Sequence, residues 1–231
     1  MSYHSDVKDA IAGIREDRII VASGLFHEKL SHIPEVTYYK SLERLVKQNS
    51  LIRVSKGIYF PVTAIHTDFS REKEIVRYYT QYGSHNNLVP GILAGSRLVK
   101  SVGFDVAESD IIEIYSYNAD FSKKIIDNVE ITKIPFMLSA NDCSMITVME
   151  VLKHYILYED IDKSQFKNYI SHICSEYDDT AMNHIIQGIK YKKKSIAFLA
   201  EILEAGGIEH SLWNILSHTS KYQIPHMEDF T

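Results

Sequence analysis

The sequence predicts an α+β protein in which a small N-terminal unit precedes a mixed α/β and then mostly helical second domain. Two periodicities support this class. Apolar residues recur at the 3.6-residue period of a helix over residues 36–49, and at the two-residue period of strands over residues 51–60. Charge gives a third observation, because residues 36–62 hold five basic side chains and one acidic one in a chain of formal net charge −5. A local basic surface on an acidic protein is typical of targeted nucleic-acid contact.

The first expected elements are short. Residues 6–17 show helical spacing of apolar side chains, residues 18–22 are rich in β-branched side chains, and residues 25–30 favour another short helix. Pro34 ends this segment. Glu35 then opens the next helix, because an acidic side chain is favourable at the positive end of the helix dipole.

The helix expected over residues 36–49 has two unlike faces. Its apolar stripe consists of Val36, Tyr39, Leu42, Leu45 and Val46. Every side chain of the opposite face can donate a hydrogen bond: Thr37, Lys40, Ser41, Arg44 and Gln48. In a helix laid in the major groove of DNA, such donors can reach base edges and phosphates.

A tight two-stranded hairpin is expected directly after this helix. The inward positions are Ile52, Val54, Ile58 and Phe60. The outward positions are Arg53, Ser55 and Lys56. Residues 55–57 form the turn, and Gly57 can adopt the positive φ that such a turn needs.

The order helix, strand, helix, turn, helix and hairpin is that of a winged helix-turn-helix, which we place in residues 1–66. In this interpretation the 36–49 helix faces bases and backbone, Tyr38 flanks the groove, and the wing holds phosphates. The candidate DNA-binding residues are Thr37, Tyr38, Lys40, Ser41, Arg44, Lys47, Gln48, Arg53 and Lys56. The alternative is an ordinary amphipathic helix and hairpin with a solvated basic face.

Residues 41–61 also resemble a known signature. They are similar to the L-x-R-L-V-K-x-G-x-L-R-R-V-x-R-G-x-Y motif of the AbiEi-type antitoxin family. The similar positions are Leu42, residues 44–46, Leu51, residues 53–54 and residues 56–59. Residues 91–103 and 191–204 resemble two further helices of that family more loosely. The chain departs from the signature at Asn49-Ser50, where relatives often have Gly, and Asn also accepts left-handed conformations. The 191–204 segment lacks the usual Pro and Arg.

The resemblance implies a winged helix-turn-helix followed by a larger domain, in an antitoxin of a type IV toxin-antitoxin system that serves abortive infection, a form of phage defence. It implies a repressor that binds inverted repeats in its own promoter as two copies. It also implies a functional partner, a nucleotidyltransferase-like toxin, without the need for a stable complex.

The second domain is placed at residues 67–231. A helix is expected at 71–82, a second at 88–101, strands at 111–117 and 129–135 around a polar loop, and an apolar helix at 145–158. Four further helices are expected at 164–177, 180–190, 193–205 and 209–218. Residues 1–62 hold 9 of the 25 basic and 7 of the 30 acidic side chains, which leaves 16 and 23 for the remainder, a net charge of −7. This domain is therefore better suited to protein contacts than to DNA.

Catalytic patterns are weak. Gly95-Ser96 followed by Asp110 and Glu113 imitates a nucleotidyltransferase, but a separation of three residues places the two carboxylates on opposite faces of a strand. No zinc-type spacing joins His154, His172, Cys174 and His184. The lysines at 190 and 192–194 are a second candidate phosphate patch or, more simply, a solvated helix start.

The residues therefore favour a DNA-binding protein, and the resemblance implies that it is a transcriptional autoregulator and antitoxin. We expect that it is not an enzyme and needs no cofactor or metal. No hydrophobic N-terminal leader or membrane-spanning run is visible, and the two cysteines form no disulfide framework, so we expect a cytoplasmic protein that does not enter a membrane. One alternative is a stand-alone winged-helix regulator with a ligand-sensing second domain. The other is a nucleotidyltransferase-like enzyme that uses the winged helix for docking.

Overall fold

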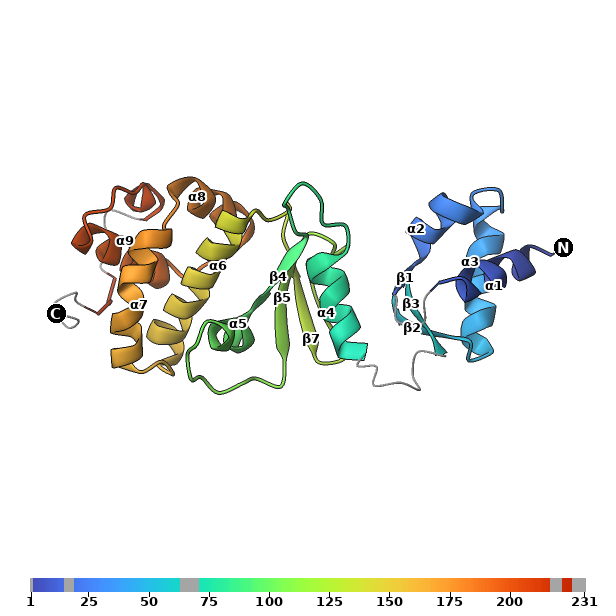
Figure 1. Ribbon diagram of the computed structural model, residues 1–231, viewed down its shortest axis with the longest axis horizontal. Helices are drawn as coiled ribbons and strands as arrows, with labels where there is room; N and C mark the ends of the chain where they lie inside the picture. The colour runs from blue at the N-terminus through green and yellow to red at the C-terminus, as the bar shows by residue number, and fades with distance from the viewer. Residues whose placement is uncertain (1, 15–18, 63–70, 217–221, 226–231) are drawn as a thin grey trace. The chain divides into compact units, whose positions relative to one another are not determined.

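The computed structural model describes residues 2–14, 19–62, 71–216 and 222–225 (Figure 1). It combines helices and strands, as the predicted α+β class requires, and it divides into two compact units, Met1–Tyr78 and Tyr79–Thr231. The sequence placed the boundary between residues 66 and 67, and the joint expected there lies outside the described residues. Among the helices of the described part, none is long and apolar enough to cross a membrane.

The N-terminal unit begins with α1 (Tyr3–Ala12), β1 (Ile20–Val21) and α2 (Ala22–Leu25), which continues as the π-helix η1 (Phe26–Leu30). Next come α3 (Glu35–Lys47), β2 (Leu51–Ser55), β3 (Ile58–Pro61) and α4 (Arg71–Gln81), whose last turn belongs to the second unit. The three strands form an antiparallel sheet in the order β1-β3-β2 (Figure 1). The helix and hairpin expected within residues 36–60 are confirmed.

Local chemistry sets the limits of α3. Pro34 is its N-cap residue and Glu35 lies in its first turn, as expected. At the other end Asn49 adopts a φ of +56°, and the N–H of Ser50 donates to the carbonyl of Leu45 at 2.9 Å. This left-handed residue closes the helix and redirects the chain into β2. Gly57 has a φ of +76° in the turn between β2 and β3, which confirms the role predicted for it.

The core of this unit fixes α3 through Tyr38. The Tyr38 side chain is fully buried, and its hydroxyl donates to the carbonyl of Ala22 at 2.8 Å. The N–H of the same Ala22 donates to the carbonyl of Gly57 at 2.8 Å. Ala22 therefore links α3 and the turn of the hairpin to the start of α2.

The second unit contains a four-stranded sheet in the order β4-β5-β7-β6. Its strands are β4 (Gly91–Ala94), β5 (Ile112–Ser116), β6 (Lys123–Ile126) and β7 (Val129–Lys133). Strands β5 and β7 are parallel, and the other neighbours are antiparallel. The helical elements are α5 (Gly95–Ser101), α6 (Ala140–Lys153), η3 (His154–Tyr158), α7 (Lys163–Glu176), α8 (Asp179–Gly188), α9 (Lys193–Ala205) and η4 (Leu212–Ile215). Figure 1 shows α6 between the sheet and the remaining C-terminal helices.

Several expectations for this unit are wrong. The first half of the helix predicted at 88–101 is strand β4, because Gly91 lies so close to β5 that a Cβ atom would come within 2.4 Å of the Tyr115 carbonyl oxygen. The loop predicted between the two central strands contains β6, an edge strand whose first three residues are exposed. Helix α6 also starts five residues earlier than expected, where Ser139 and Asp142 form a reciprocal capping box.

A buried carboxylate joins α6 to the sheet. Glu150 is fully buried, and one of its oxygens accepts from the hydroxyl of Tyr115 on β5 at 3.0 Å. The other oxygen accepts from the N–H of Gly95 at 3.0 Å and from the ammonium of Lys153 at 2.9 Å. Lys153 also lies 3.6 Å from Glu113. A buried charge is tolerated only when it is paired and hydrogen-bonded, and Glu150 meets both conditions.

The substitution Tyr38→Phe should remove the hydrogen bond to Ala22 and lower the stability of the N-terminal unit by about 0.5–1.5 kcal/mol. Hydrogen exchange of amides in α3 measures this loss locally. Burial raises the pKa of the Tyr38 hydroxyl, so its favourable contribution is present below the unfolded-state pKa and falls as the pH rises above about 10. The cost of the substitution should therefore shrink in alkaline buffer.

Tyr39→Phe is the matched control, since it removes a hydroxyl from the adjacent, partly buried residue of the same helix. It should leave the exchange rates nearly unchanged. Equal effects of the two substitutions would contradict a special role for Tyr38.

Lys153→Met should destabilise the second unit by at least about 2 kcal/mol, because it leaves the Glu150 carboxylate buried without its cation. Water still reaches part of the Lys153 side chain, which keeps the loss below that of a fully enclosed pair. The single tryptophan, Trp213, lies in this unit, so its fluorescence during urea unfolding reports the effect. The control is Lys133→Met, at an exposed position of β7, which should change the stability of the unit little. Similar losses of stability in both variants would exclude a specific stabilising role for Lys153 beside Glu150.

Candidate nucleic-acid interface

Five exposed cations lie on α3 and the hairpin. Helix α3 carries Lys40, Arg44 and Lys47, strand β2 carries Arg53, and the turn carries Lys56. Within the described residues, none of the five forms an ion pair with a carboxylate. Since no ion pair among the described residues holds these charges, they can interact with an external partner.

The exposed face of α3 is rotated from its predicted position. The buried residues are Tyr38, Ser41, Leu42 and Leu45, whereas Val36 is 68% exposed. At about 100° per residue, the observed apolar face is turned by roughly 80° from the predicted stripe. The prediction that Val36 lies in the core is therefore wrong. Lys40 and Arg44 remain exposed because they lie in the range shared by the predicted and observed polar faces.

Two predicted DNA contacts are wrong for the same reason. Tyr38 does not flank a groove, because its ring is fully buried and its hydroxyl is used by Ala22. Ser41 is 2% exposed, and its hydroxyl donates to the carbonyl of Thr37 at 3.0 Å. This bond to the preceding turn lets a small polar residue face the core without an unpaired hydroxyl.

The remaining predicted residues of α3 are accessible to different extents. Thr37 is partly buried at the edge of the exposed face, Lys47 is exposed near its centre, and Gln48 is exposed at the C-cap. Glu43 was not singled out, yet it is exposed on the same face, one turn from Lys40 and from Lys47. Helical periodicity with the corrected phase would have identified both Glu43 and Val36 as outward residues.

The hairpin presents Arg53 and Lys56 to solvent, but it buries Ser55, which was expected to point outward. The strict alternation fails because β2 has an irregularity between Arg53 and Ser55, which pair with Tyr59 and Ile58. Such a bulge shifts the side chains that follow it. Burial raises the pKa of the Tyr59 hydroxyl, and the adjacent Arg53 guanidinium opposes that rise.

The arrangement can hold an extended anion. A helix face with three free cations and a hairpin with two more provide separate contacts, and the Ala22 backbone bonds to Tyr38 and Gly57 hold the helix and the hairpin in register. The phosphates of duplex DNA are spaced regularly along two strands, so two separate cationic elements can contact phosphates of both strands.

The two carboxylates of the nucleotidyltransferase-like pattern are not placed together, as a two-metal site would require. Glu113 on β5 lies beside Lys153, and Asp110 is exposed before the strand begins. Gly95 has a φ of +62°, and a Cβ atom there would come within 2.3 Å of a Glu113 carboxylate oxygen. The side chain that packs closely against Gly95 is therefore that of Glu113.

Two histidines of the second unit, His154 and His184, are paired with separate carboxylates. The Nδ1 atom of His154 lies 2.8 Å from Asp160, and that of His184 lies 2.9 Å from Asp142. Over the described ranges, no group of three or more His, Cys, Asp and Glu side chains could hold a metal ion. Burial raises the pKa of the Cys143 thiol to about 11, with a further contribution from Asp142, which disfavours the thiolate form at neutral pH.

Comparison with known proteins assigns no family to the chain. No protein-family model matches it, and no curated protein shows significant similarity to it. The functional argument therefore rests on the residues of this chain, their geometry and the motif resemblance described for residues 41–61.

Proposed function

We propose that the N-terminal unit is a winged helix-turn-helix that binds duplex DNA. The element order, the antiparallel sheet β1-β3-β2 and the placement of α3 directly before the β2–β3 hairpin support this assignment. The observation that carries it is the set of five exposed cations on α3 and the hairpin, which find no carboxylate partner among the described residues.

In the proposed complex α3 lies in the major groove. Lys40, Arg44 and Lys47 face bases and backbone, with Thr37 and Gln48 at the edges of the contact. Arg53 and Lys56 on the wing bind phosphates. Tyr38 and Ser41 touch no DNA, and they orient α3 by holding its buried face.

We further propose that the protein is a transcriptional autoregulator and the antitoxin of a type IV toxin-antitoxin system that acts in abortive infection. This part rests on the resemblance of residues 41–61 to AbiEi-type antitoxins. Two copies would repress the operon promoter at inverted repeats. The acidic second unit would counteract a nucleotidyltransferase-like toxin in the cytoplasm without a stable complex, and without enzymatic activity of its own.

A stand-alone regulator with a ligand-sensing second unit is the second candidate. A hollow in that unit, lined by apolar and cationic side chains, favours it. The two candidates differ in genomic setting, because only the antitoxin requires an adjacent gene for a nucleotidyltransferase-like toxin.

Arg44→Ala should weaken specific binding by roughly 1–3 kcal/mol if the guanidinium reads a base. Gel shifts with the upstream operon DNA and with a scrambled duplex measure both affinity and specificity. Lys8→Ala, which removes an exposed cation from α1, should leave both unchanged. A loss that is equal on the two duplexes would assign Arg44 to phosphates instead of bases, and no loss would remove it from the interface.

Lys56→Ala should reduce the slope of log affinity against log salt by roughly one unit, since each neutralised phosphate releases about one counterion. Titrations at four or more salt concentrations determine the slope. The same substitution should change affinity about equally for operator and scrambled duplex. A slope identical to that of the unaltered chain would place the turn of the hairpin away from the DNA backbone.

The double variant Arg44→Ala, Lys56→Ala should lose repression of its promoter but still rescue growth when co-expressed with the neighbouring toxin. The physical reason is that the altered side chains belong to the N-terminal unit, whereas the proposed antitoxic surface belongs to the other unit. Reporter expression and colony growth separate the two activities. Failure of the unaltered chain to rescue growth would refute the antitoxin role and leave the DNA-binding proposal standing.

A further inference from the structure

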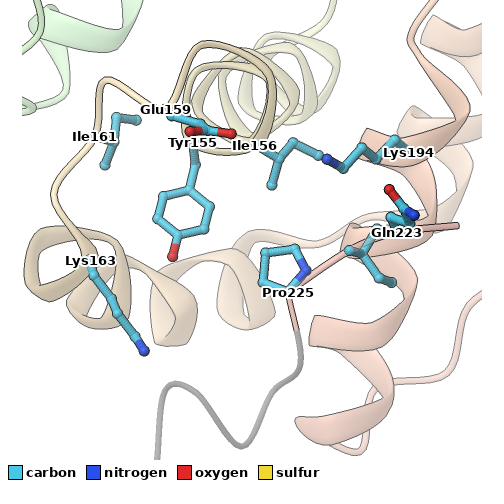
Figure 2. Close-up of a pocket in the computed structure, with 9 residues that line it drawn as sticks. Tyr155, Ile156, Glu159, Ile161, Lys163, Lys194, Gln223 and Pro225 are labelled. Atoms are coloured by element: carbon cyan, nitrogen blue, oxygen red, sulfur yellow. The ribbon is translucent and has the colours of Figure 1, made fainter.

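The second unit contains a cavity of about 480 Å³, which is lined by residues of η3 and the loop after it, the starts of α7 and α9, and the C-terminal segment Gln223–Pro225 (Figure 2). This volume is typical of sites for small organic molecules. All of the lining residues belong to the second unit, and none belongs to the candidate DNA interface.

One part of the lining is apolar. Ile156 and Ile161 are 5% and 6% exposed, so they form a buried base. The Tyr155 ring stacks on Phe166 with centroids 3.9 Å apart and an angle of 10° between the planes. Figure 2 shows Pro225 close to this ring. An apolar group entering here would replace water against preformed hydrophobic surface.

The rim carries a positive charge. Lys194 and Gln223 line the cavity on one side of Tyr155 in Figure 2, and Lys163 lies on the other side. The lysines belong to the first turns of α9 and α7, whose peptide dipoles add positive potential. Among the described lining residues Glu159 is the acidic one.

We propose that this cavity binds a small organic monoanion with an apolar body, of the alkyl or aryl carboxylate class. The apolar body lies against Tyr155, Ile156 and Ile161, and the anionic group lies near Lys194 with the Gln223 amide as a hydrogen-bond donor. Glu159 opposes a ligand of high negative charge, which favours one carboxylate over a polyphosphate.

A fluorescence titration of the full-length protein with anilinonaphthalene sulfonate tests the site, because this probe combines an aromatic body with one anionic group. Lys194→Glu should raise its Kd about fivefold to tenfold by replacing attraction with repulsion. Lys190→Glu makes the same charge change at an exposed position outside the lining and should alter Kd less than about twofold. Ile224→Trp should also weaken binding by filling the cavity. Far-ultraviolet circular dichroism and melting curves verify that each variant is folded.

Competition then identifies the ligand class. Octanoate should displace the probe, whereas inorganic phosphate at the same concentration and ionic strength should not. Displacement by phosphate as strong as by octanoate would overturn the monoanion assignment. An unchanged Kd in both folded variants, Lys194→Glu and Ile224→Trp, would overturn the site itself.

Discussion

The backbone of Ala22 is the constraint on which the candidate DNA-binding surface depends. Its carbonyl accepts the Tyr38 hydroxyl, and its N–H donates to the Gly57 carbonyl. One buried residue therefore fixes both the rotation of α3 and the position of the turn that carries Lys56. Since each residue advances around a helix by about 100°, rotation of α3 by a single position would bring apolar side chains to the surface and move the cations away. The buried Tyr38 side chain thus determines which residues of α3 are exposed.

The sequence predicts the presence of α3 and the hairpin better than it predicts their orientation. A period of 3.6 residues identifies an amphipathic helix, but the predicted apolar stripe places Val36 inside and Tyr38 outside, whereas the structure exposes Val36 and buries Tyr38. The buried state of Tyr38 depends on a carbonyl 16 residues away, and that of Ser41 depends on the Thr37 carbonyl. Neither bond is visible in a periodic pattern. Gly57 was predictable because a tight turn needs positive φ whatever its surroundings.

The second unit shows the same limit on a larger scale. Strand β4 is identified by its close approach to β5 at Gly91, a tertiary contact that no local pattern contains. Strand β6 is an exposed edge strand held by pairing with β7, so its side chains lack an apolar alternation. The burial of Glu150 depends on residues that are far away in the sequence. Its carboxylate accepts from Gly95 of α5 and Tyr115 of β5, as well as from Lys153 of its own helix. A carboxylate in an apolar helix would otherwise indicate a solvent-facing position.

The start of α9 is positively charged, lacks a side-chain cap and lies at the cavity. Ser139, Asp162 and Asp178 cap α6, α7 and α8 through side-chain oxygens, which suits the positive end of a helix. Lysine stands at the N-cap of α9 and supplies no side-chain cap, and two more lysines follow it, which is unfavourable for the isolated helix. The sequence favours a solvated helix start over a phosphate patch for this run, whereas the structure places Lys194 in the lining of the cavity. Local rules are most often broken at functional sites, and an anion near Lys194 would offset the electrostatic cost that α9 bears without it.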